Sequence, residues 1–458
     1  MLCAPPAPSL DGENKVNALQ IPYAADDGNG GPAWGAGRES NIMGRQTGMK
    51  GSGAILFQDV RLAGGSTVAD LLVRDGRIAA IGRVDGRGEA VVVQGTGRLL
   101  APSFIDPHTH LDKAFLETPR EAEGLMDAVL MTREYQQNLP LADVQADVIR
   151  RGGRVLALEL ENGTGLVRSH VSVDEIWGME AFYASCELRA RYAGRLDVQL
   201  SVPYDRRFLA QWEEAARAGQ IDYIAGYPTI TPDYRAAVDE LIAVSEKYAI
   251  PLDLHVDESD AANIDCFRYL MEQTIAHGLH GRVNCSHVTA LAAVPHREAE
   301  EAIALCARAE ASVIALPSCN LFLMGRGDRG IVRRGITRIA ELERAGVNVA
   351  IGSDNIRDPF RPFGNADPLE EALLTCQLLS RGTESGMSDV LRMVTGNAAL
   401  ASGRQDYGLS VGAPADLVLL DAPDEKTALI ENAARLLVLK NGRPVAGELS
   451  GRHVHSCD

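Results

Sequence analysis

Two histidines at positions 108 and 110 flank a single threonine in the segment IDPHTHLDK. The apolar run LLAPSFI (residues 99–105) leads into this pair, and Asp112 and Lys113 follow it. In a β-strand, residues i and i+2 point to the same face. If the apolar run is a strand, both imidazoles leave its end on one side, which is a geometry for holding one metal ion. A pair of surface histidines on a loop would have the same spacing, so the rest of the chain has to decide.

The elements that would position these residues alternate along the middle of the chain. Short apolar runs of the β type recur, and amphipathic helical patterns lie between them. Counting the run that leads into His108, there are eight; the other seven are TGLVRSHVSV, LDVQLSVPY, DYIAGYP, IPLDLHVDE, RVNCSHVT, ASVIALP and VNVAIGSDN. Eight βα units predict an α/β fold, a TIM-type (β/α)8 barrel over residues 101–404, whose active site lies at the carboxyl ends of the strands.

Histidines and an acid stand at the ends of four of these strands. His108 and His110 end the first strand, His255 the fifth, His287 the sixth and Asp354 the eighth. One histidine in an apolar run is more often a core residue than a ligand, but chance would have to place all of these side chains at one mouth independently. Imidazole and carboxylate suit a divalent zinc or iron ion. We therefore expect His108, His110, His255 and Asp354 to bind such an ion and to leave a position for water.

Three residues could carry out proton chemistry at this place. Glu258 lies three residues beyond His255 and could pass a proton to a ring nitrogen or a leaving amine. His287 is a candidate partner for a developing oxyanion or for the attacking hydroxide, and Asp354 could take the proton of the water. His170, in VRSHVSV, is either a further contact or a core histidine.

The expected number of metal ions follows from a missing lysine. Some metal-dependent barrels hold two ions bridged by a modified lysine at the end of the fourth strand. Here that end reads YIAGYP, and no lysine occurs between Lys113 and Lys247. The sequence therefore predicts one divalent metal ion as the cofactor.

Two β-rich segments at opposite ends of the chain predict a second, smaller domain. Residues 51–100 contain AILFQDVRL, VADLLVRDGRIAAIG and all but the last two residues of AVVVQGTGRLLAP, and residues 405–450 contain APADLVLLD and ARLLVLKNGRPVAG, with Asn-Gly as a hairpin signal. We expect both segments to form one small β-sandwich-like domain into which the barrel is inserted. Residues 1–50 are rich in Gly, Pro, Asn and Asp, which predicts a disordered extension or a start assigned too early.

Composition and charge limit the classes of partner. The chain has 458 residues, of which 46% are hydrophobic and 23% charged, and this supports a large folded core. The net charge of −17 argues against a nucleic-acid partner, because no basic field can displace counterions from phosphate. No apolar run approaches the ~18 residues of a membrane span, and the first residues lack the pattern of a signal peptide. The eight cysteines are scattered without a CxxC. We expect no membrane partner, a cytoplasmic location and a homo-oligomer.

Several stretches together resemble the amidohydrolase superfamily, and most closely the cytosine deaminases. They are HTHLDK, VRSHVSVD, DLHVDESD, GRVNCSH, GITRIAELERAGVNVAIGSDNIRDPF and QDYGLSVGAPADLVLLD, which span most of residues 97–445. HTHLDK and SDNIRD also resemble the N-isopropylammelide amidohydrolases. The resemblance implies the same four metal ligands for one zinc or iron ion, with Glu258 as the acid and base and His287 beside the hydrolytic water.

Four positions are expected to line the substrate pocket. By the resemblance, Asn355 stands where a cytosine deaminase has a second aspartate, Tyr204 where it has a glutamine, and Phe360 where it has a tryptophan. Groups that read a substrate by hydrogen bonds discriminate strongly, so these differences predict that cytosine itself is a poor substrate. Lys113 either lines the pocket and contacts a substrate carbonyl or lies in a surface loop.

The leading hypothesis is a metal-dependent hydrolase that deaminates a small nitrogen heterocycle of the pyrimidine or triazine type, with water as the second substrate. The same machinery could instead open the ring of a cyclic amide or imide. A third hypothesis is a catalytically inactive relative that acts as a scaffold, but such proteins lose metal ligands, and every ligand position is filled here. Release of ammonia distinguishes the first hypothesis from the second, and metal content tests the third.

Overall fold

The computed structural model describes residues 53–84 and 90–447. The extension predicted for residues 1–50 lies outside the described residues. None of the helices within the two described ranges combines the length and the apolar character that crossing a membrane requires.

Eight parallel strands form the barrel that the sequence predicts. Their spatial order is β13-β12-β11-β10-β9-β8-β7-β6, so each strand pairs with its neighbour in the chain. The strands are β6 (Phe104–Thr109), β7 (Thr164–His170), β8 (Asp197–Pro203), β9 (Tyr223–Gly226), β10 (Leu252–Val256), β11 (Val283–His287), β12 (Ser312–Ala315) and β13 (Asn348–Ile351). Each strand corresponds to one of the eight apolar runs, because a parallel strand buried on both faces needs apolar residues on both. The barrel prediction is confirmed.

The barrel closes between its first and last strands at the HxH segment. Thr109 and Asp354 form a parallel bridge. The amide of Asp354 donates to the carbonyl of His108 at 2.8 Å, and the amide of His110 donates to the carbonyl of Asp354 at 3.1 Å. The first and eighth strand ends are therefore joined by backbone hydrogen bonds at the predicted ligands.

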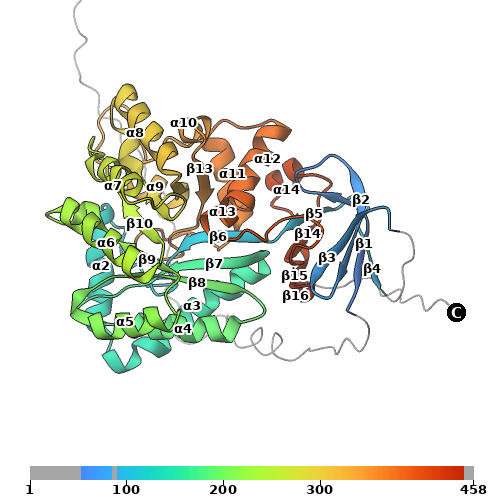
Figure 1. Ribbon diagram of the computed structural model, residues 1–458, viewed down its shortest axis with the longest axis horizontal. Coiled ribbons are helices and arrows are strands. Elements are labelled where there is room, and N and C mark those ends of the chain that lie inside the picture. The colour runs from blue at the N-terminus through green and yellow to red at the C-terminus, as the bar shows by residue number, and fades with distance from the viewer. Residues whose placement is uncertain (1–52, 85–89, 448–458) are drawn as a thin grey trace, which may run out of the picture. The chain divides into compact units, whose positions relative to one another are not determined.

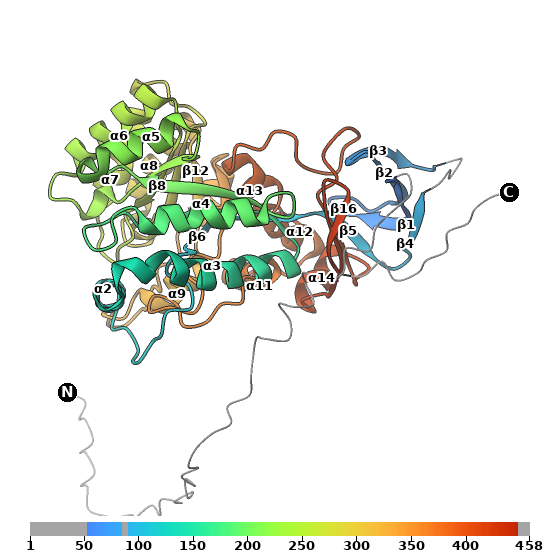
Figure 2. The same ribbon diagram turned by 90° about the horizontal axis from the view of Figure 1, so that it is seen from below.

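Helices surround the barrel, as Figure 1 and Figure 2 show from two directions. In α8, the buried residues Ala299, Ala302, Ile303 and Cys306 follow the i, i+3, i+4, i+7 pattern and form one face, which packs inward. The helices that accompany the barrel are α2 (Leu125–Asn138), α3 (Val144–Glu161), α4 (Glu180–Tyr192), α5 (Leu209–Arg217), α6 (Tyr234–Tyr248), α7 (Asp265–Ala276), α8 (His296–Ala309), α9 (Pro317–Leu323), α10 (Ile339–Arg344), α11 (Pro368–Leu378), α12 (Glu384–Met393) and α13 (Gly396–Ala401).

The two ends of the described chain form one mixed sheet beside the barrel (Figure 1). Its order is β16-β15-β14-β5-β1-β2-β3, and β4 also pairs with β1. The strands are β1 (Ile55–Leu62), β2 (Val68–Arg74), β3 (Arg77–Gly82), β4 (Val91–Gln94), β5 (Leu99–Pro102), β14 (Leu417–Leu420), β15 (Arg435–Lys440) and β16 (Arg443–Gly447), with α14 (Glu425–Ile430) between β14 and β15. The ends meet where β5 pairs antiparallel with β14. This confirms the two-ended sheet, while the predicted domain boundaries stay a prediction.

A buried lysine connects this sheet to the barrel. Lys440, at the end of β15, is 2% exposed, and its ammonium donates to Asp416 and Asp197 at 2.7 Å each and to the carbonyl of Gly165 at 3.1 Å. Asp197 begins β8 and Gly165 lies in β7, so these bonds span both parts. A buried charge needs such partners, because desolvation alone costs several kcal/mol.

Candidate metal centre and active site

The predicted metal ligands meet at the carboxyl ends of the barrel strands. His108 lies near the end of β6 and His110 directly after it, His255 lies in β10, and Asp354 follows β13. All four side chains are buried, with at most 7% exposed. His287, the last residue of β11, is buried as well. The barrel therefore brings side chains from four strands to one mouth.

The ligating atoms of these residues lie close together. Oδ1 of Asp354 is 3.3 Å from Nε2 of His110 and 3.6 Å from Nε2 of His108. The ring centroids of His108 and His255 are 4.7 Å apart. Three groups could each hold a metal ion with ligand atoms within 4.8 Å of one another: His108, His110 and Asp354; His108, His255 and His287; and His108, His170 and Asp253. His108 belongs to all three groups, and the first two, which contain the four predicted ligands and His287, fit a single shared centre.

Buried nitrogen atoms without a hydrogen bond indicate where an ion would sit. Within residues 53–84 and 90–447, Nε2 of His108, Nδ1 of His255 and Nε2 of His287 are buried and have no hydrogen-bond partner. Leaving a buried polar atom unpaired costs about 1–3 kcal/mol. Nδ1 of His110 is 3.1 Å from the carbonyl of His170; as the donor there, it leaves the Nε2 lone pair facing Asp354. These residues fit a divalent metal ion.

Burial keeps the imidazoles in the neutral form that a metal ion requires. It lowers the pKa of His108 and of His255 well below the usual histidine value, and the nearby His170 lowers both further. Burial, followed by the charge of Lys113, lowers the pKa of His110 to about 4. All three rings are therefore neutral at neutral pH, with a lone pair available for a ligand bond.

At Asp354 the neighbouring groups outweigh the effect of burial on the pKa, and the backbone is strained. Burial by itself raises the pKa of its carboxyl, but the neighbouring His110 and His287 outweigh burial, so the pKa lies below its usual range. Its φ of 59° is in the left-handed region that non-glycine residues rarely adopt. The hydroxyl of Thr109 donates to its carbonyl at 3.1 Å, which helps to hold this conformation. Strain of this kind is typical of functional sites.

Glu258 and His287 form a pair next to the ligand cluster. Oε1 of Glu258 is 3.3 Å from Nδ1 of His287, and the side-chain amide of Asn320 donates to the same oxygen at 3.3 Å. Burial raises the pKa of Glu258 to about 7, although the charge of His287 opposes the rise. A carboxyl with a pKa near neutral can both accept and give a proton, which is the property of a general acid and base.

Lys113 and Phe360 lie together at the edge of this site. The ammonium of Lys113 is 5.3 Å from the centroid of the Phe360 ring, within the range of a cation–π contact. The charge of Lys113 acts on the pKa of both His110 and Glu258, so the lysine is close to the ligand cluster and not on a remote surface loop. Phe360 packs with Cys319 in the small apolar cluster beside α9.

Asn355 is also at the site, but its amide is already occupied. Its Nδ2 donates to Asp358 at 2.6 Å, and Sγ of Cys319 lies 3.5 Å from its Oδ1. Asp358 is held in turn by the backbone amides of Phe360 and Arg361, at 2.9 and 3.0 Å. The amide of Asn355 is therefore engaged by the protein itself, and a substrate would have to compete for it.

Two tyrosines differ in how they relate to the site. Tyr204 contacts the ring of Trp212 in α5, and the charges nearest to its hydroxyl include Glu240 in α6, so its contacts do not lie with the histidine cluster. Tyr227, which sequence reasoning missed, has its ring centroid 4.5 Å from that of His255. It follows directly after β9, at the end of the fourth strand. That position was the one available signal, because residues after barrel strands face the active site.

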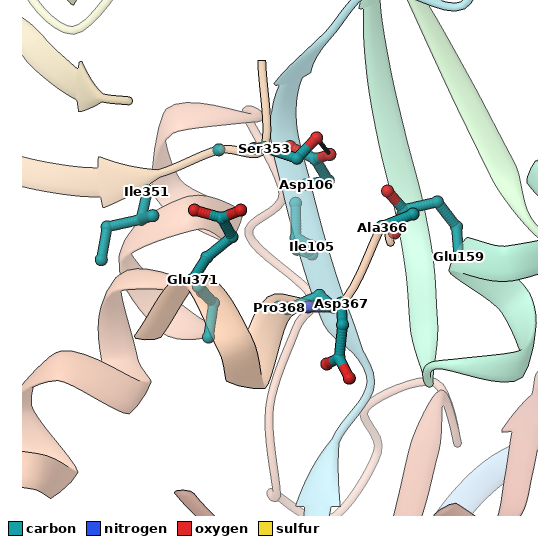
Figure 3. A pocket seen from close by; sticks show the side chains of 11 residues that line it. Ile105, Asp106, Glu159, Ile351, Ser353, Ala366, Asp367, Pro368 and Glu371 are labelled. Atoms are coloured by element: carbon teal, nitrogen blue, oxygen red, sulfur yellow. Dashed lines mark hydrogen bonds between the residues drawn. The ribbon is translucent and has the colours of Figure 1, made fainter. Parts of the chain in front are cut away.

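A small acidic pocket lies behind the end of β13 (Figure 3). Asp106 of β6 accepts hydrogen bonds from the amides of His108 at 3.2 Å and Ser353 at 3.1 Å, and from the Ser353 hydroxyl. Glu159 of α3 and Glu371 of α11 reach the same pocket. Burial, followed by the charge of Asp106, raises the pKa of Glu159 well above its usual value. The hydrogen bonds of Asp106 therefore connect the HxH segment to Ser353, which precedes the proposed ligand Asp354.

Comparisons with known proteins agree with this geometry. Residues 193–446 match the Amidohydrolase family. The chain is 31% identical to the pterin deaminase of Rhizobium rhizogenes (strain K84 / ATCC BAA-868) over 393 residues, which cover 82% of this chain and 87% of that protein. It is 26% identical to the N-isopropylammelide isopropyl amidohydrolase of Pseudomonas sp. (strain ADP), over 85% of this chain and 96% of that protein. The crystal structure of 5-methylcytosine deaminase from Klebsiella pneumoniae, liganded with 5-fluorocytosine, matches with a TM-score of 0.79 and 25% identity, covering 86% of this chain and 98% of that chain.

The family match covers part of the site, because His108 and His110 lie before its first residue. The matched residues include the strands that carry His255 and His287 and the segment of Asp354. Members of this family generally use a divalent metal ion, and the buried histidine and aspartate cluster fits one. The chain therefore belongs to the amidohydrolase family, as a deaminase-like hydrolase that acts on C–N bonds.

Proposed function

We propose that this protein hydrolytically deaminates a small nitrogen heterocycle at one divalent metal ion, zinc or iron. The observation that carries the proposal is Glu258, whose carboxyl has a pKa of about 7 and lies 3.3 Å from His287 beside the ligand cluster. The relatives support the substrate class, since pterin, N-isopropylammelide and 5-methylcytosine are all nitrogen heterocycles. The proposed ligands are His108, His110, His255 and Asp354.

One ion is favoured over two by the end of the fourth strand. The residue that follows β9 is Tyr227, and no lysine that could bridge two ions occurs between Lys113 and Lys247. Bound at this place, a divalent ion supplies Lewis acidity, which polarises an electrophile and makes a water more acidic. Three histidines and one carboxylate suit zinc or iron better than magnesium or calcium.

Glu258 and His287 carry out the proposed proton transfers. Glu258 accepts a proton from the attacking water and passes it to a ring nitrogen or to the leaving amine. The water oxygen bonds to the ring carbon, the bond from that carbon to the amine breaks, and ammonia or an amine leaves with the proton. His287 stabilises the negative charge that develops on the oxygen. Asp354, ionised and buried, is proposed as the fourth ligand and as a second group that can take the proton of the water.

Lys113 and Phe360 are the best supported substrate contacts. The ammonium of Lys113 can donate to a ring carbonyl, and the face of Phe360 can pack against a flat heterocycle. The substrate-binding roles predicted for Tyr204 and Asn355 stay predictions, which the contacts of Tyr204 with α5 and α6 and the bond of Asn355 to Asp358 do not support. We still expect cytosine to be a poor substrate.

An ammonia-release screen on metal-loaded protein tests this proposal. The panel contains pterins, triazines, pyrimidines and cyclic ureas, and His108→Ala serves as the inactive control. We expect ammonia or an amine from at least one class and little from cytosine. A new carboxylate without ammonia would favour the ring-opening hydrolase instead. A kcat/KM near about 10⁵ M⁻¹s⁻¹ for cytosine, within the usual enzyme range, would contradict the expected specificity.

A further inference from the structure

A chain of hydrogen bonds runs through the barrel interior to the ring of His108. Oγ of Ser286 lies 2.8 Å from Nδ1 of His108 and 3.3 Å from Oδ1 of Asp253. Ser286 and Asp253 stand on the neighbouring strands β11 and β10, and His108 stands across the barrel on β6. All three side chains are fully buried. Barrel interiors are usually filled with branched apolar side chains, so three hydrogen-bonded polar side chains at this depth indicate a specific role.

The chemistry of the three groups gives the chain a direction. An ionised carboxylate can only accept hydrogen bonds, so the hydroxyl of Ser286 donates to Asp253. The lone pairs of the same hydroxyl then accept the hydrogen on Nδ1 of His108. A neutral imidazole carries one hydrogen, so Nε2 of His108 keeps its lone pair. Nε2 has no other hydrogen-bond partner in the described ranges and is 3.6 Å from Oδ1 of Asp354.

Asp253 is held as a carboxylate by two further groups. Nη1 of Arg168 donates to its Oδ2 at 2.5 Å, and Nε2 of His170 is 3.4 Å from the same oxygen. Arg168 is fixed in turn, because its Nη2 donates to the carbonyl of Ala401 at 2.9 Å and its guanidinium lies 3.6 Å from the centroid of the Tyr223 ring. Arg168 and Ser286 thus donate to the two different oxygens of Asp253, so the carboxylate is the acceptor at the end of this series of hydrogen bonds.

We propose that Asp253 and Ser286 are positioning residues that fix the tautomer and the ring orientation of His108, so that Nε2 faces the metal ion. The inference rests on the proposed metal centre. The ring of His110 is oriented by the backbone carbonyl of His170, whose oxygen lies 3.1 Å from Nδ1. The hydrogen-bonded series from Asp253 through Ser286 to His108, which we call the relay, is built from side chains and can be removed by substitution. Outer groups that orient a ligating histidine typically contribute about 10- to 100-fold to metal affinity.

The first test measures the affinity for Zn²⁺ alone, by competition with a chromophoric chelator on the full chain. We expect Ser286→Ala to weaken binding by about 10- to 100-fold and Ser286→Thr, which keeps a hydroxyl, to restore most of the loss. The matched control is Ser201→Ala. Ser201 is a buried serine of β8 whose hydroxyl has no hydrogen-bond partner within the described part of the chain. Its substitution removes the same atom from the barrel and should leave the affinity unchanged.

The second test reads the tautomer of His108 directly, by NMR of protein labelled with ¹⁵N in histidine. The signals of His108 are assigned from their loss in His108→Asn. We expect wild-type His108 to carry its hydrogen on Nδ1 in both the metal-free and the zinc-loaded protein. In metal-free Ser286→Ala we expect a mixture of both tautomers. A residue that only fills space would not change this distribution, so the measurement separates positioning from packing.

The outcomes distinguish this inference from the proposed function. If wild-type protein binds no zinc, or His108→Ala binds it equally well, the metal centre and the relay are both wrong. If the wild type binds zinc but Ser286→Ala keeps the wild-type affinity and tautomer, the relay alone is wrong. If Ser286→Ala does not fold, the wild-type spectrum still decides, because a His108 with no hydrogen on Nδ1 contradicts the relay.

Discussion

At the scale of single residues, the proposed chemistry depends on Glu258. A carboxyl in water is ionised at neutral pH and has no proton to give. Glu258 is different because burial raises its pKa to about 7, while His287 at 3.3 Å keeps it oriented. The amide of Asn320 donates to the same carboxylate oxygen, so the group has one fixed position next to the ligand cluster.

Replacing this carboxyl by an amide should separate proton transfer from metal binding. We expect Glu258→Gln to fold and bind zinc like the wild type but to lose about 10²- to 10⁴-fold in kcat, because an amide keeps the shape and cannot carry the proton. Steady-state kinetics and elemental analysis on the same preparation give both values. Glu246→Gln, on α6 and paired with His277 at the surface, is the matched control. A kcat near that of the wild type would refute the role of Glu258.

The two tyrosines offer a matched test of where the substrate lies. Tyr227 is beside His255, whereas Tyr204 packs against Trp212. We expect Tyr227→Phe to lower kcat/KM by about 2- to 10-fold, the value of one neutral hydrogen bond, and Tyr204→Phe to leave it unchanged. The best substrate from the ammonia screen is used for both. The opposite pattern would show that the assignment of Tyr204 from the sequence is right.

Some site residues could be placed from the sequence and others could not. The i, i+2 spacing predicts that His108 and His110 leave the end of a strand on one side. In the structure β6 ends at Thr109 and His110 follows it, and Nε2 of both rings faces Asp354. Tyr227 was missed because a tyrosine after an apolar run is also an ordinary strand ending. The hydrogen bond from Nδ2 of Asn355 to Oδ2 of Asp358, at 2.6 Å, could not be predicted either, because it depends on a turn that brings Asp358 back to Asn355.

At the scale of elements, the strands follow the sequence more closely than the helices do. Each barrel strand is buried on both faces, so its apolar run marks it without ambiguity. One of the amphipathic helical patterns between the strands, DEIWGMEAFYASCELRARYAG, begins at Asp174, but α4 begins at Glu180. The carboxylate of Asp174 accepts hydrogen bonds from the amides of Ile176 and Trp177, at 2.8 and 2.9 Å, and forms a turn that competes with the helix.

The contact between β6 and β13 leaves no room for a side chain at Gly352. A Cβ there would be 2.8 Å from the carbonyl oxygen of His108 and 3.1 Å from Oδ1 of Asp106. We expect Gly352→Ala to cost about 1–3 kcal/mol of stability and to weaken zinc binding, because the ligand segments must move apart. Gly396→Ala, where nothing lies within 4 Å of the new atom, is the control. Equal denaturation midpoints and zinc affinities in the two variants would count against this packing.

The acidic pocket behind the ligands predicts a pH dependence of stability. Burial, and then Asp106, raises the pKa of Glu159 well above its usual value, so the folded protein keeps a proton that the unfolded chain has lost. Stability should therefore fall as the pH rises from about 5 toward the raised pKa. Glu159→Gln has no proton to lose, so its melting temperature relative to the wild type should increase over this range.

Thermal unfolding at several pH values checks this expectation. Glu161→Gln, an exposed position at the end of the same helix, should give a profile parallel to that of the wild type. A difference between Glu159→Gln and the wild type that does not change with pH would show that Glu159 titrates normally.

At the scale of the whole molecule, the second sheet leads directly into the barrel. β5 ends at Pro102 and β6 begins at Phe104, and β5 pairs with β14 from the far end of the chain. Both β-rich segments could be recognised from the sequence, but their pairing was an inference that the structure confirms. The homo-oligomeric state and the cytoplasmic location stay predictions, since they concern surroundings that a single chain does not contain.

The central claim is metal-dependent hydrolytic deamination, and mass spectrometry of the product formed in H₂¹⁸O tests it most directly. The best substrate of the screen is incubated with zinc-loaded and with metal-free protein, and ammonia or free amine is measured in parallel. We expect a product that has lost the amine and gained one ¹⁸O, equimolar with the released amine, and formed by the metal-loaded protein alone. A product that keeps every nitrogen and has added water, or equal turnover without metal, would contradict the account.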